Sequence, residues 1–149
     1  MSSPCKRPES VLVVVYTLAG DVLVLRRHRP ADFWQSVTGS LEWEETEPLQ
    51  AAYRELREET GLGAGLQVID CGSVNRFPIL PPWQPRYGAA RENTEYVFRV
   101  ALPTRLPICL NPEEHDRYLW LPREEAAAKV TSYTNRDAIL QYVPEFRPG

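Results

Sequence analysis

The chain has 149 residues, of which 43% are hydrophobic and 25% are charged, and its formal net charge is −3. A chain of this length is expected to form a single domain over residues 1–149 and to bury enough surface to fold without disulfide bonds. The negative charge argues against binding to a nucleic-acid polymer, which usually needs a basic patch, and the apolar run Val11–Val15 is far shorter than the ~20 residues of a membrane span.

Hydrophobic periodicity and turn signals predict strands that alternate with helices. In chain order, the predicted elements are strands at Val11–Leu18, Val22–Arg27 and Phe33–Thr38, a helix at 46–60, strands at Leu66–Asn75, Thr94–Ala101 and Arg117–Leu121, and helices at Arg123–Lys129 and Asn135–Tyr142. Four prolines within Pro78–Pro85 exclude regular structure there and predict a stiff loop, which either walls a pocket or joins strands. Strands interleaved with helices imply a sheet covered on both faces.

The helix expected over residues 46–60 carries its own start and stop signals. Thr46 is the candidate N-cap, and Gly61 stands where a left-handed C-terminal residue is expected. The residues that follow the spacing of a buried stripe are Leu49, Ala52, Tyr53 and Leu56.

Three glutamates of this helix, Glu55, Glu58 and Glu59, lie at positions i, i+3 and i+4 and share one face. Like charges at this spacing repel by roughly 0.2–0.5 kcal/mol per pair, so three in one turn suggest a compensating cation. Oxygen ligands suit a hard divalent ion such as Mg²⁺. An ordinary solvated acidic face is the alternative, and a lone E-x-x-E-E pattern favours it.

The flanking residues favour the metal-binding interpretation, because the segment Gly39–Leu62 resembles the Nudix box, G-x5-E-x7-R-E-U-x-E-E-x-G-U with U aliphatic. The matching residues are Gly39, Glu45, Arg54, Glu55, Leu56, Glu58, Glu59, Gly61 and Leu62. Eight residues separate Glu45 from Arg54, where the family has seven, so the support of Arg54 by Glu45 depends on the tertiary structure. The resemblance implies an α/β/α sandwich with a mixed β-sheet and hydrolysis of a diphosphate linkage on an organic group.

The same resemblance implies Mg²⁺, with Mn²⁺ as a substitute, held by Glu55, Glu58 and Glu59 and by the carbonyl of Gly39. Such ions neutralise phosphate oxygens, polarise phosphorus and lower the pKa of a bound water. Glu114, on a loop before the last expected strand, is the candidate for a further ligand, the general base, or both. Glu59 and Glu114 are thus the predicted catalytic residues, and an exposed loop acid is the alternative for Glu114.

Further segments resemble one branch of the family, whose members hydrolyse dihydroneopterin triphosphate in folate biosynthesis and have also been described as acting on dATP. These segments are Lys6–Pro8, Asp32–Ser40, Asn93–Glu95 and Ser132–Arg136. The resemblance implies a small triphosphate substrate, with pyrophosphate and dihydroneopterin monophosphate as the products.

Five residues are candidate substrate contacts. Lys6 and Arg27 carry cationic donors that pair with phosphate oxygens, with solvated surface charge as the alternative. Thr38 and Ser132 offer hydroxyl groups, and Phe77 offers a face on which a flat ring can stack. Both histidines of the chain are expected to be solvated and to lie outside any metal site.

Two other functions compete with this interpretation. A nucleoside triphosphate pyrophosphohydrolase, acting on dATP or an oxidised nucleotide, would use the same metal site and differ in base recognition. A catalytically silent Nudix-like module that binds a nucleotide or a protein partner is disfavoured, since such modules usually lose the glutamates that are present here. A calcium helix does not fit, because the chain has no Asp-rich twelve-residue loop.

The three cysteines, Cys5, Cys71 and Cys109, are an odd number without metal-site spacing and are typical of reduced thiols in a cytosolic protein. With no targeting segment evident, the cytoplasm is the expected location. The sequence leaves the oligomeric state open.

Overall fold

The computed structural model describes residues 5–145. Its elements are β1 (Glu9–Thr17), β2 (Asp21–Arg27), β3 (Trp34–Gln35), β4 (Val37–Ser40), α1 (Pro48–Thr60), β5 (Ile69–Pro78), the 3₁₀ turn η1 (Gln84–Tyr87), β6 (Glu92–Leu102), β7 (His115–Pro122), α2 (Arg123–Lys129) and α3 (Tyr133–Tyr142). Within these residues no helix is both long enough and apolar enough to cross a membrane.

In the described part of the chain, the strands form one seven-stranded mixed sheet with β1 at its centre. β1 runs parallel to β6 and antiparallel to β2 and β4, and the outer pairs, β2 with β3 and β7 and β5 with β6, are antiparallel. On one edge of β1, the N-terminal half pairs with β4 over Ser10–Val13, while Tyr16 pairs with Val22 of β2. β2 and β4 therefore share this edge.

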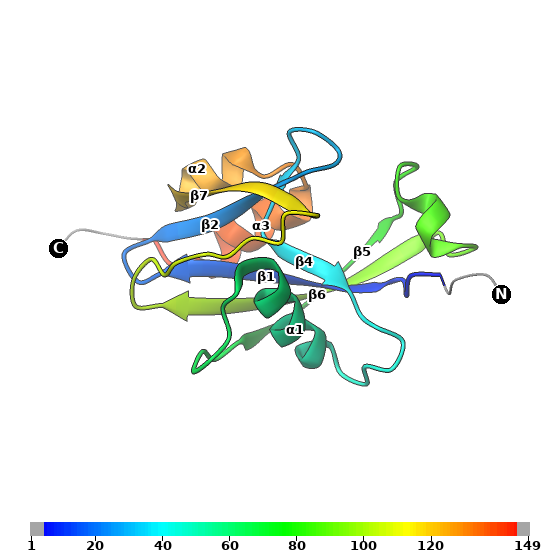
Figure 1. Cartoon of the computed structure of the whole chain (residues 1–149), viewed down its shortest axis with the longest axis horizontal. Coiled ribbons are helices and arrows are strands. Elements are labelled where there is room, and N and C mark those ends of the chain that lie inside the picture. Colours follow the sequence, from blue (N-terminus) through cyan, green and yellow to red (C-terminus); the bar gives the residue numbers. More distant parts are fainter. Residues whose placement is uncertain (1–4, 146–149) are drawn as a thin grey trace.

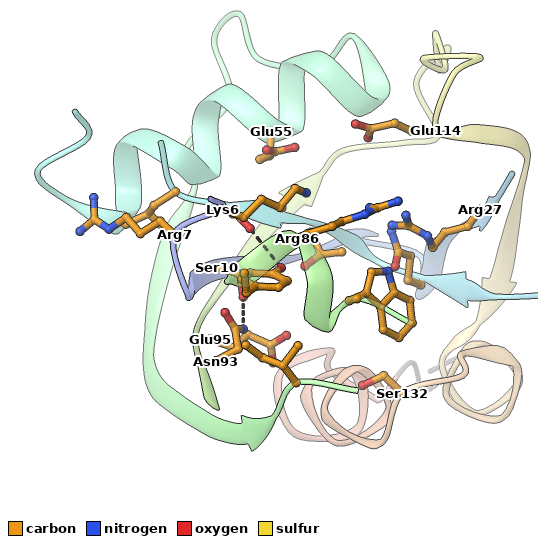
Figure 2. Close-up of a pocket in the computed structure, with 18 of the residues that line it drawn as sticks. Lys6, Arg7, Ser10, Arg27, Glu55, Arg86, Asn93, Glu95, Glu114 and Ser132 are labelled. Carbon is orange, nitrogen blue, oxygen red and sulfur yellow. Dashed lines mark hydrogen bonds between the residues drawn. The ribbon is translucent and has the colours of Figure 1, made fainter. Parts of the chain in front are cut away.

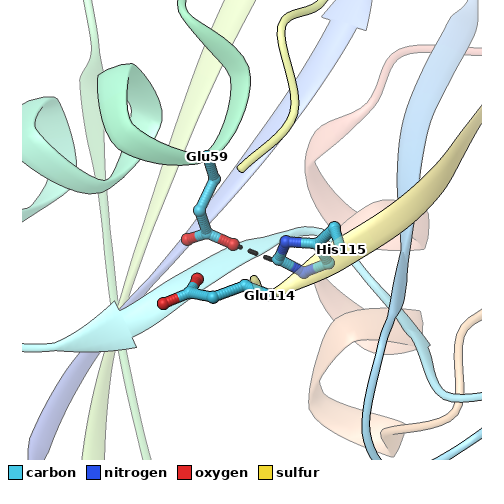
Figure 3. Close-up of side chains that lie close together, drawn as sticks. All are labelled: Glu59, Glu114 and His115. Carbon is cyan, nitrogen blue, oxygen red and sulfur yellow. Dashed lines mark ion pairs between the residues drawn. The ribbon is translucent and has the colours of Figure 1, made fainter. Parts of the chain in front are cut away.

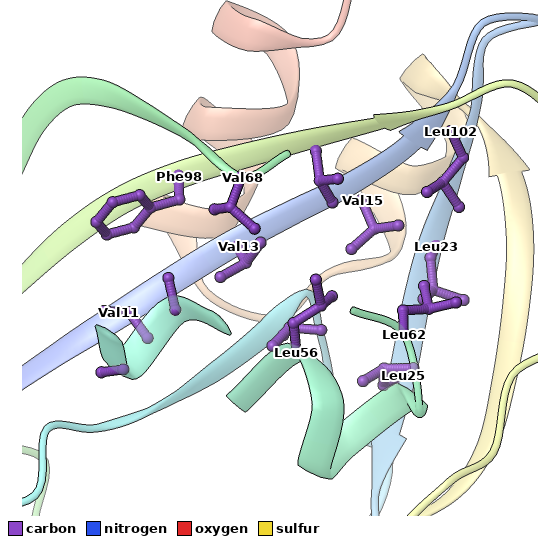
Figure 4. Packing of buried hydrophobic residues seen from close by; sticks show 14 of the residues in the cluster. Val11, Val13, Val15, Leu23, Leu25, Leu56, Leu62, Val68, Phe98 and Leu102 are labelled. Carbon is purple, nitrogen blue, oxygen red and sulfur yellow. The ribbon is translucent and has the colours of Figure 1, made fainter. Parts of the chain in front are cut away.

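The helices cover both faces of the sheet (Figure 1): α1 packs against β1 and β4, and α2 and α3 pack on the opposite face against β2 and β1. Successive side chains of a strand point to opposite faces, so β1 contributes to two cores. Val11 and Val13 pack with Leu56 of α1 (Figure 4), whereas Leu12 packs with Ile139 of α3. The result is the α/β/α arrangement that the sequence predicts.

The predicted elements are all present, but several have shifted ends. The expected strand Phe33–Thr38 is divided into β3 and β4, and the expected strand Leu66–Asn75 lies three residues later in the chain. Pro78–Pro85 was expected to contain no regular structure, and this is wrong at both ends, since β5 extends to Pro78 and η1 begins at Gln84. Pro85 is compatible with η1 because the first turn of a helix needs no intrahelical N–H donor.

The start of α1 differs from the prediction that Thr46 is the N-cap. Glu47 immediately precedes the first helical residue, Pro48. Gln50 reaches back, and its side-chain oxygen accepts hydrogen bonds from the backbone N–H groups of Thr46 and Glu47 at 2.9 and 3.0 Å. A glutamine in the first turn thus satisfies donors that the helix itself leaves unpaired.

The buried face of α1 also differs from the predicted stripe. Leu49 was expected in the core but is 37% exposed, whereas Ala51 is completely buried. The buried face continues from Ala51 in steps of four residues through Glu55 and Glu59. Two of the glutamates therefore lie within the helix–sheet contact.

Candidate active site

β4 brings the backbone of Gly39 directly against the Glu55 side chain. A Cβ atom on residue 39 would lie 2.2 Å from both Cδ and Oε1 of Glu55, which is far inside van der Waals contact. Only glycine therefore allows this carboxyl group to reach β4. Burial raises the pKa of Glu55 above its usual value, because the carboxylate loses hydration.

Arg54 connects α1 to the loop that precedes it. Its Nε and Nη2 donate to the two carboxylate oxygens of Glu45 at 3.1 and 2.9 Å, and Nη2 also donates to the carbonyl oxygen of Ser40 at 2.9 Å. Its Nη1 donates to Glu55 at 2.8 Å and to Glu58 at 3.2 Å. The eight-residue spacing thus does not separate Glu45 from Arg54. Because the guanidinium uses all of its donors within the protein, it organises the site instead of binding substrate.

Glu59, Glu114 and His115 form a cluster where α1 meets the start of β7 (Figure 3). One potential metal-ligand atom from each residue lies within 4.8 Å of the others. Glu59 and His115 are buried and Glu114 is exposed. The fold therefore brings together the two predicted catalytic carboxylates, which come from distant parts of the sequence.

The carboxylate of Glu59 is buried without a hydrogen-bond partner. Within residues 5–145, neither of its oxygens accepts a hydrogen bond of ordinary geometry, and the backbone N–H of Thr38 makes only a weak contact that lowers the pKa of Glu59 slightly. Burial raises the pKa of Glu59 well above its usual value, and the neighbouring carboxylates of Glu55 and Glu114 raise it further. A buried charge without a partner is strongly unfavourable, so this position requires either a proton or a cation.

His115 was expected to be solvated, and this expectation is wrong. The residue is only 1% exposed, and its Nε2 lies 3.5 Å from Oε1 of Glu59 and 3.1 Å from Nε2 of Gln35. Burial, together with the positive charge of Arg27, lowers the pKa of His115 to about 4. The imidazole is therefore neutral at pH 7, and the position of its proton decides whether Nε2 donates toward Glu59 or accepts from Gln35.

A pocket of about 1220 Å³ lies beside this cluster. Figure 2 shows Glu55 and Glu114 at one end and Ser132, next to α3, at the other. Phe77, Ile79, Leu80 and Trp83 also line the pocket, so the proline-rich segment is a wall of this cavity as well as a connection between strands.

The metal-site residues predicted from the sequence occupy different positions relative to this pocket. Gly39, Glu55 and Glu114 line it. Among residues 5–145, Glu58 and Glu59 are absent from its lining. Glu59 is buried next to Glu114, whereas the Glu58 side chain is 49% exposed and pairs with Arg54. Of the predicted ligands, Glu58 therefore has the least support from the geometry.

Lys6, Arg27 and Arg86 lie between the two ends of the pocket (Figure 2). The backbone N–H of Lys6 donates to the carbonyl oxygen of Arg86 at 2.8 Å, which links the N-terminal segment to η1. Arg27 is half-buried, and burial lowers its pKa. Arg86 is not among the substrate contacts predicted from the sequence. Its position directly after the proline-rich segment, a possible pocket wall, is the signal that could have indicated it.

The other predicted substrate contacts, Thr38, Phe77 and Ser132, also line the pocket. The hydroxyl of Thr38 donates to the carbonyl oxygen of Val11 at 2.8 Å, so its single donor hydrogen is already used. Ser132 is the N-cap of α3, and its Oγ accepts from the N–H of Thr134 at 3.2 Å. Thr38 and Ser132 therefore have structural roles in addition to any contact with substrate.

Comparison with known proteins gives a family match over most of the chain. The NUDIX domain family model matches residues 6–142. The chain is 44% identical over 143 residues to dihydroneopterin triphosphate diphosphatase of Escherichia coli (strain K12), covering 93% of each protein. It is 34% identical over 147 residues to the protein of the same name from Haemophilus influenzae, covering 95% of this chain and 91% of that protein.

Solved structures show the same similarity. The structure of the E. coli dihydroneopterin triphosphate pyrophosphohydrolase superimposes with a TM-score of 0.88 and 42% identity, covering 95% of this chain and 98% of that one. A NUDIX hydrolase structure from Listeria monocytogenes superimposes with a TM-score of 0.78 and 24% identity, covering 92% of each chain. The α/β/α sandwich with a mixed sheet is therefore the fold shared with these structures.

Proposed function

The chain belongs to the NUDIX family, and from this premise we propose that it hydrolyses dihydroneopterin triphosphate to dihydroneopterin monophosphate and inorganic pyrophosphate. The observation that carries the proposal is the 44% identity with the E. coli dihydroneopterin triphosphate diphosphatase over 93% of each protein. The family assignment makes the chain a pyrophosphohydrolase. We further propose that residues 1–149 form one domain, of which the family model covers 6–142.

The acidic residues fit a divalent cation, which NUDIX hydrolases use. The supporting observation is the carboxylate of Glu59, whose two buried oxygens have no hydrogen-bond partner among residues 5–145. We propose Mg²⁺ as the ion, with Mn²⁺ as a substitute, because carboxylate and carbonyl oxygens suit these hard cations. The proposed ligands are Gly39 (through its carbonyl oxygen), Glu55, Glu58, Glu59 and Glu114. When bound, the cation supplies neutralisation of phosphate charge and polarisation of phosphorus.

Side chains of the protein supply the proton acceptor and the positive charge that the reaction needs. Glu114 is exposed at the pocket, so its carboxylate can accept a proton from the attacking water, serve as a ligand, or do both. The neutral imidazole of His115 lies beside the proposed cation site, with its Nε2 3.5 Å from Oε1 of Glu59. Lys6, Arg27 and Arg86 offer positive charge to the triphosphate.

A substrate panel tests this function. The purified protein is incubated with dihydroneopterin triphosphate, dATP or an oxidised guanine nucleotide, in Mg²⁺ or in EDTA, and pyrophosphate is measured. We expect the highest kcat/KM with dihydroneopterin triphosphate and no pyrophosphate in EDTA.

Two outcomes of the panel would contradict the proposal. Equal or higher kcat/KM with dATP would favour a nucleotide pyrophosphohydrolase. Failure to release pyrophosphate from any triphosphate in Mg²⁺ would favour a catalytically silent binding module.

A further inference from the structure

The floor of the pocket is made of buried polar side chains to which the sequence analysis gave no role. Asn93, Glu95 and Ser10 are 5%, 4% and 6% exposed, and all three line the pocket (Figure 2). Asn93 and Glu95 are two residues apart on β6 and therefore point to the same face of the sheet. Ser10 lies opposite Glu95 in the parallel pairing of β1 with β6.

Among residues 5–145, the hydrogen bonds on this floor leave the side-chain oxygen of Asn93 without a donor. The Nδ2 of Asn93 donates to Oγ of Ser10 at 2.7 Å, but in the part of the chain that the structure describes its Oδ1 has no partner. Glu95 accepts a hydrogen bond from Nδ2 of Asn75 at 3.2 Å and a second from the side chain of Thr134, and its two oxygens have further lone pairs. Burial raises the pKa of Glu95, and hydrogen bonds from Thr134 and Asn75 oppose this increase. Buried acceptors are costly unless a donor reaches them, so the floor is suited to a ligand that brings N–H groups.

Given the proposed function, we propose that Glu95, assisted by the carbonyl oxygen of Asn93, recognises the 2-amino-4-oxo edge of the substrate's ring. This edge carries a ring N–H beside an amino group, and these two adjacent donors match the two oxygens of a carboxylate. Adenine presents an amino group beside an unprotonated ring nitrogen, whose lone pair would face the carboxylate. The floor therefore favours a pterin, or the chemically similar edge of guanine, over adenine.

The arrangement of the pocket agrees with this orientation of the substrate. Figure 2 shows Glu55 at one end, Arg27 and Arg86 in the middle, and Glu95 beyond them. A ring held at Glu95 places its triphosphate tail toward the arginines and then the acidic end. Phe77 is paired with Asn93 across β5 and β6, so its side chain lies on the same face and can stack on the ring.

The test compares Glu95→Gln with the wild-type protein. The amide replaces one carboxylate acceptor by a donor, so kcat/KM for dihydroneopterin triphosphate is expected to fall about 10- to 100-fold, as for a lost hydrogen bond to a charged group. The glutamine can pair with both groups of the adenine edge, so kcat/KM for dATP should stay constant or rise. A uniform loss for both substrates, or no loss for the pterin, would overturn the proposal.

Glu92→Gln is the matched control, because Glu92 is an exposed residue of the same strand and the substitution removes the same charge. It should leave both kcat/KM values unchanged.

Thermal unfolding shows whether Glu95→Gln is folded. If it is not, the wild-type protein decides the question through dGTP and dITP, which differ only in the 2-amino group. A kcat/KM for dGTP about tenfold or more above that for dITP supports the proposal, and equal values overturn it.

Failure of the proposed function can be distinguished from failure of this inference. If the wild-type protein releases no pyrophosphate from any triphosphate, the proposed function is wrong. Ring recognition is then tested by calorimetric titration of dihydroneopterin itself into the wild-type and Glu95→Gln proteins. Tighter binding to the wild type supports recognition by Glu95, and equal affinity or no binding to either protein excludes it.

Discussion

Glu59 and Gly39 show how the site depends on the surroundings of individual residues. The carboxylate of Glu59 is completely buried, and no group in residues 5–145 donates a hydrogen bond of ordinary geometry to it. Gly39 lacks a Cβ atom, and the carboxyl group of Glu55 occupies the space where that atom would lie. An unpaired buried carboxylate lowers the stability of the fold, and the close approach at residue 39 restricts that position to glycine. Both features fit the cation site proposed above.

The catalytic assignments lead to a prediction for the two clustered glutamates. Glu59→Gln and Glu114→Gln should each lower kcat by at least ~10²-fold, the usual scale of a general acid–base contribution, because an amide neither accepts a proton nor binds a divalent cation as a carboxylate does. The measurement is steady-state pyrophosphate release in Mg²⁺. Glu113→Gln, which changes the charge of the same exposed loop, should retain the wild-type kcat. Near-wild-type turnover in Glu114→Gln would remove Glu114 from the mechanism.

At the scale of elements, α1 is both a core helix and the scaffold of the acidic site. Its buried face carries Leu56 into the hydrophobic cluster and Glu55 and Glu59 into the site. Arg54 fixes the preceding loop through Glu45. A displacement of this helix would therefore disturb packing and carboxylate geometry together.

The helix offers a matched pair of leucines for a stability measurement. Leu56→Ala should lower the free energy of unfolding by about 2–5 kcal/mol, because Leu56 is completely buried and the substitution leaves a cavity. Leu49→Ala, at a position that is 37% exposed, should change it by no more than about 0.5 kcal/mol. Urea unfolding monitored by circular dichroism measures both. Similar losses for the two variants would mean that the first turn of α1 is packed as the sequence pattern predicted.

At the scale of the whole molecule, the pocket connects the two faces of the sheet. Glu55 comes from the helix on one face, and Ser132 begins the helix α3 on the other. β4 lies between them, where it shares the edge of β1 with β2. This shared edge lets one cavity be lined by carboxylates from α1 and from the loop before β7, by basic side chains and by the buried polar floor.

The buried acidic cluster should make stability depend on pH and on metal. The pKa of Glu59 in the folded protein lies well above its ordinary value of 4.5. The stability that this group contributes is therefore fully present below about pH 4.5 and is lost as pH rises through the raised pKa. His115 acts in the opposite sense, since its pKa is lowered from 6.5 to about 4 and its contribution is lost as pH falls through this interval.

Comparison with Glu59→Gln isolates the effect of the carboxyl group. In EDTA, the free energy of unfolding of the variant relative to the wild type should increase between about pH 5 and about pH 8, because the variant has no buried proton to lose. At the higher pH, Mg²⁺ should stabilise the wild type more than the variant, since the ion binds the folded state. Urea unfolding at both pH values, with EDTA or Mg²⁺, measures these differences. A pH-independent difference that Mg²⁺ does not alter would contradict a cation site at Glu59.

The sequence by itself determined the features that depend on local spacing. Three glutamates at i, i+3 and i+4 share a helix face at any position in a fold, and alternating or helical periodicity located each strand and helix to within a few residues. The spacing of Gly39, Arg54 and Glu55 was sufficient for the family resemblance. The tertiary structure decided the role of Glu45, because side-chain contact across a longer loop depends on how that loop folds.

Only the tertiary structure decided which polar residues are buried and which distant segments meet. His115 is the first residue of β7, which begins two residues before the predicted strand and pairs His115 with Arg27 of β2. Its proximity to Glu59 depends on how the sheet packs against α1. Asn93 meets Ser10 across 83 residues of sequence because β1 and β6 pair in parallel. Local spacing carries no information about such strand order and register, since these are set by the packing of the whole sheet between its helices.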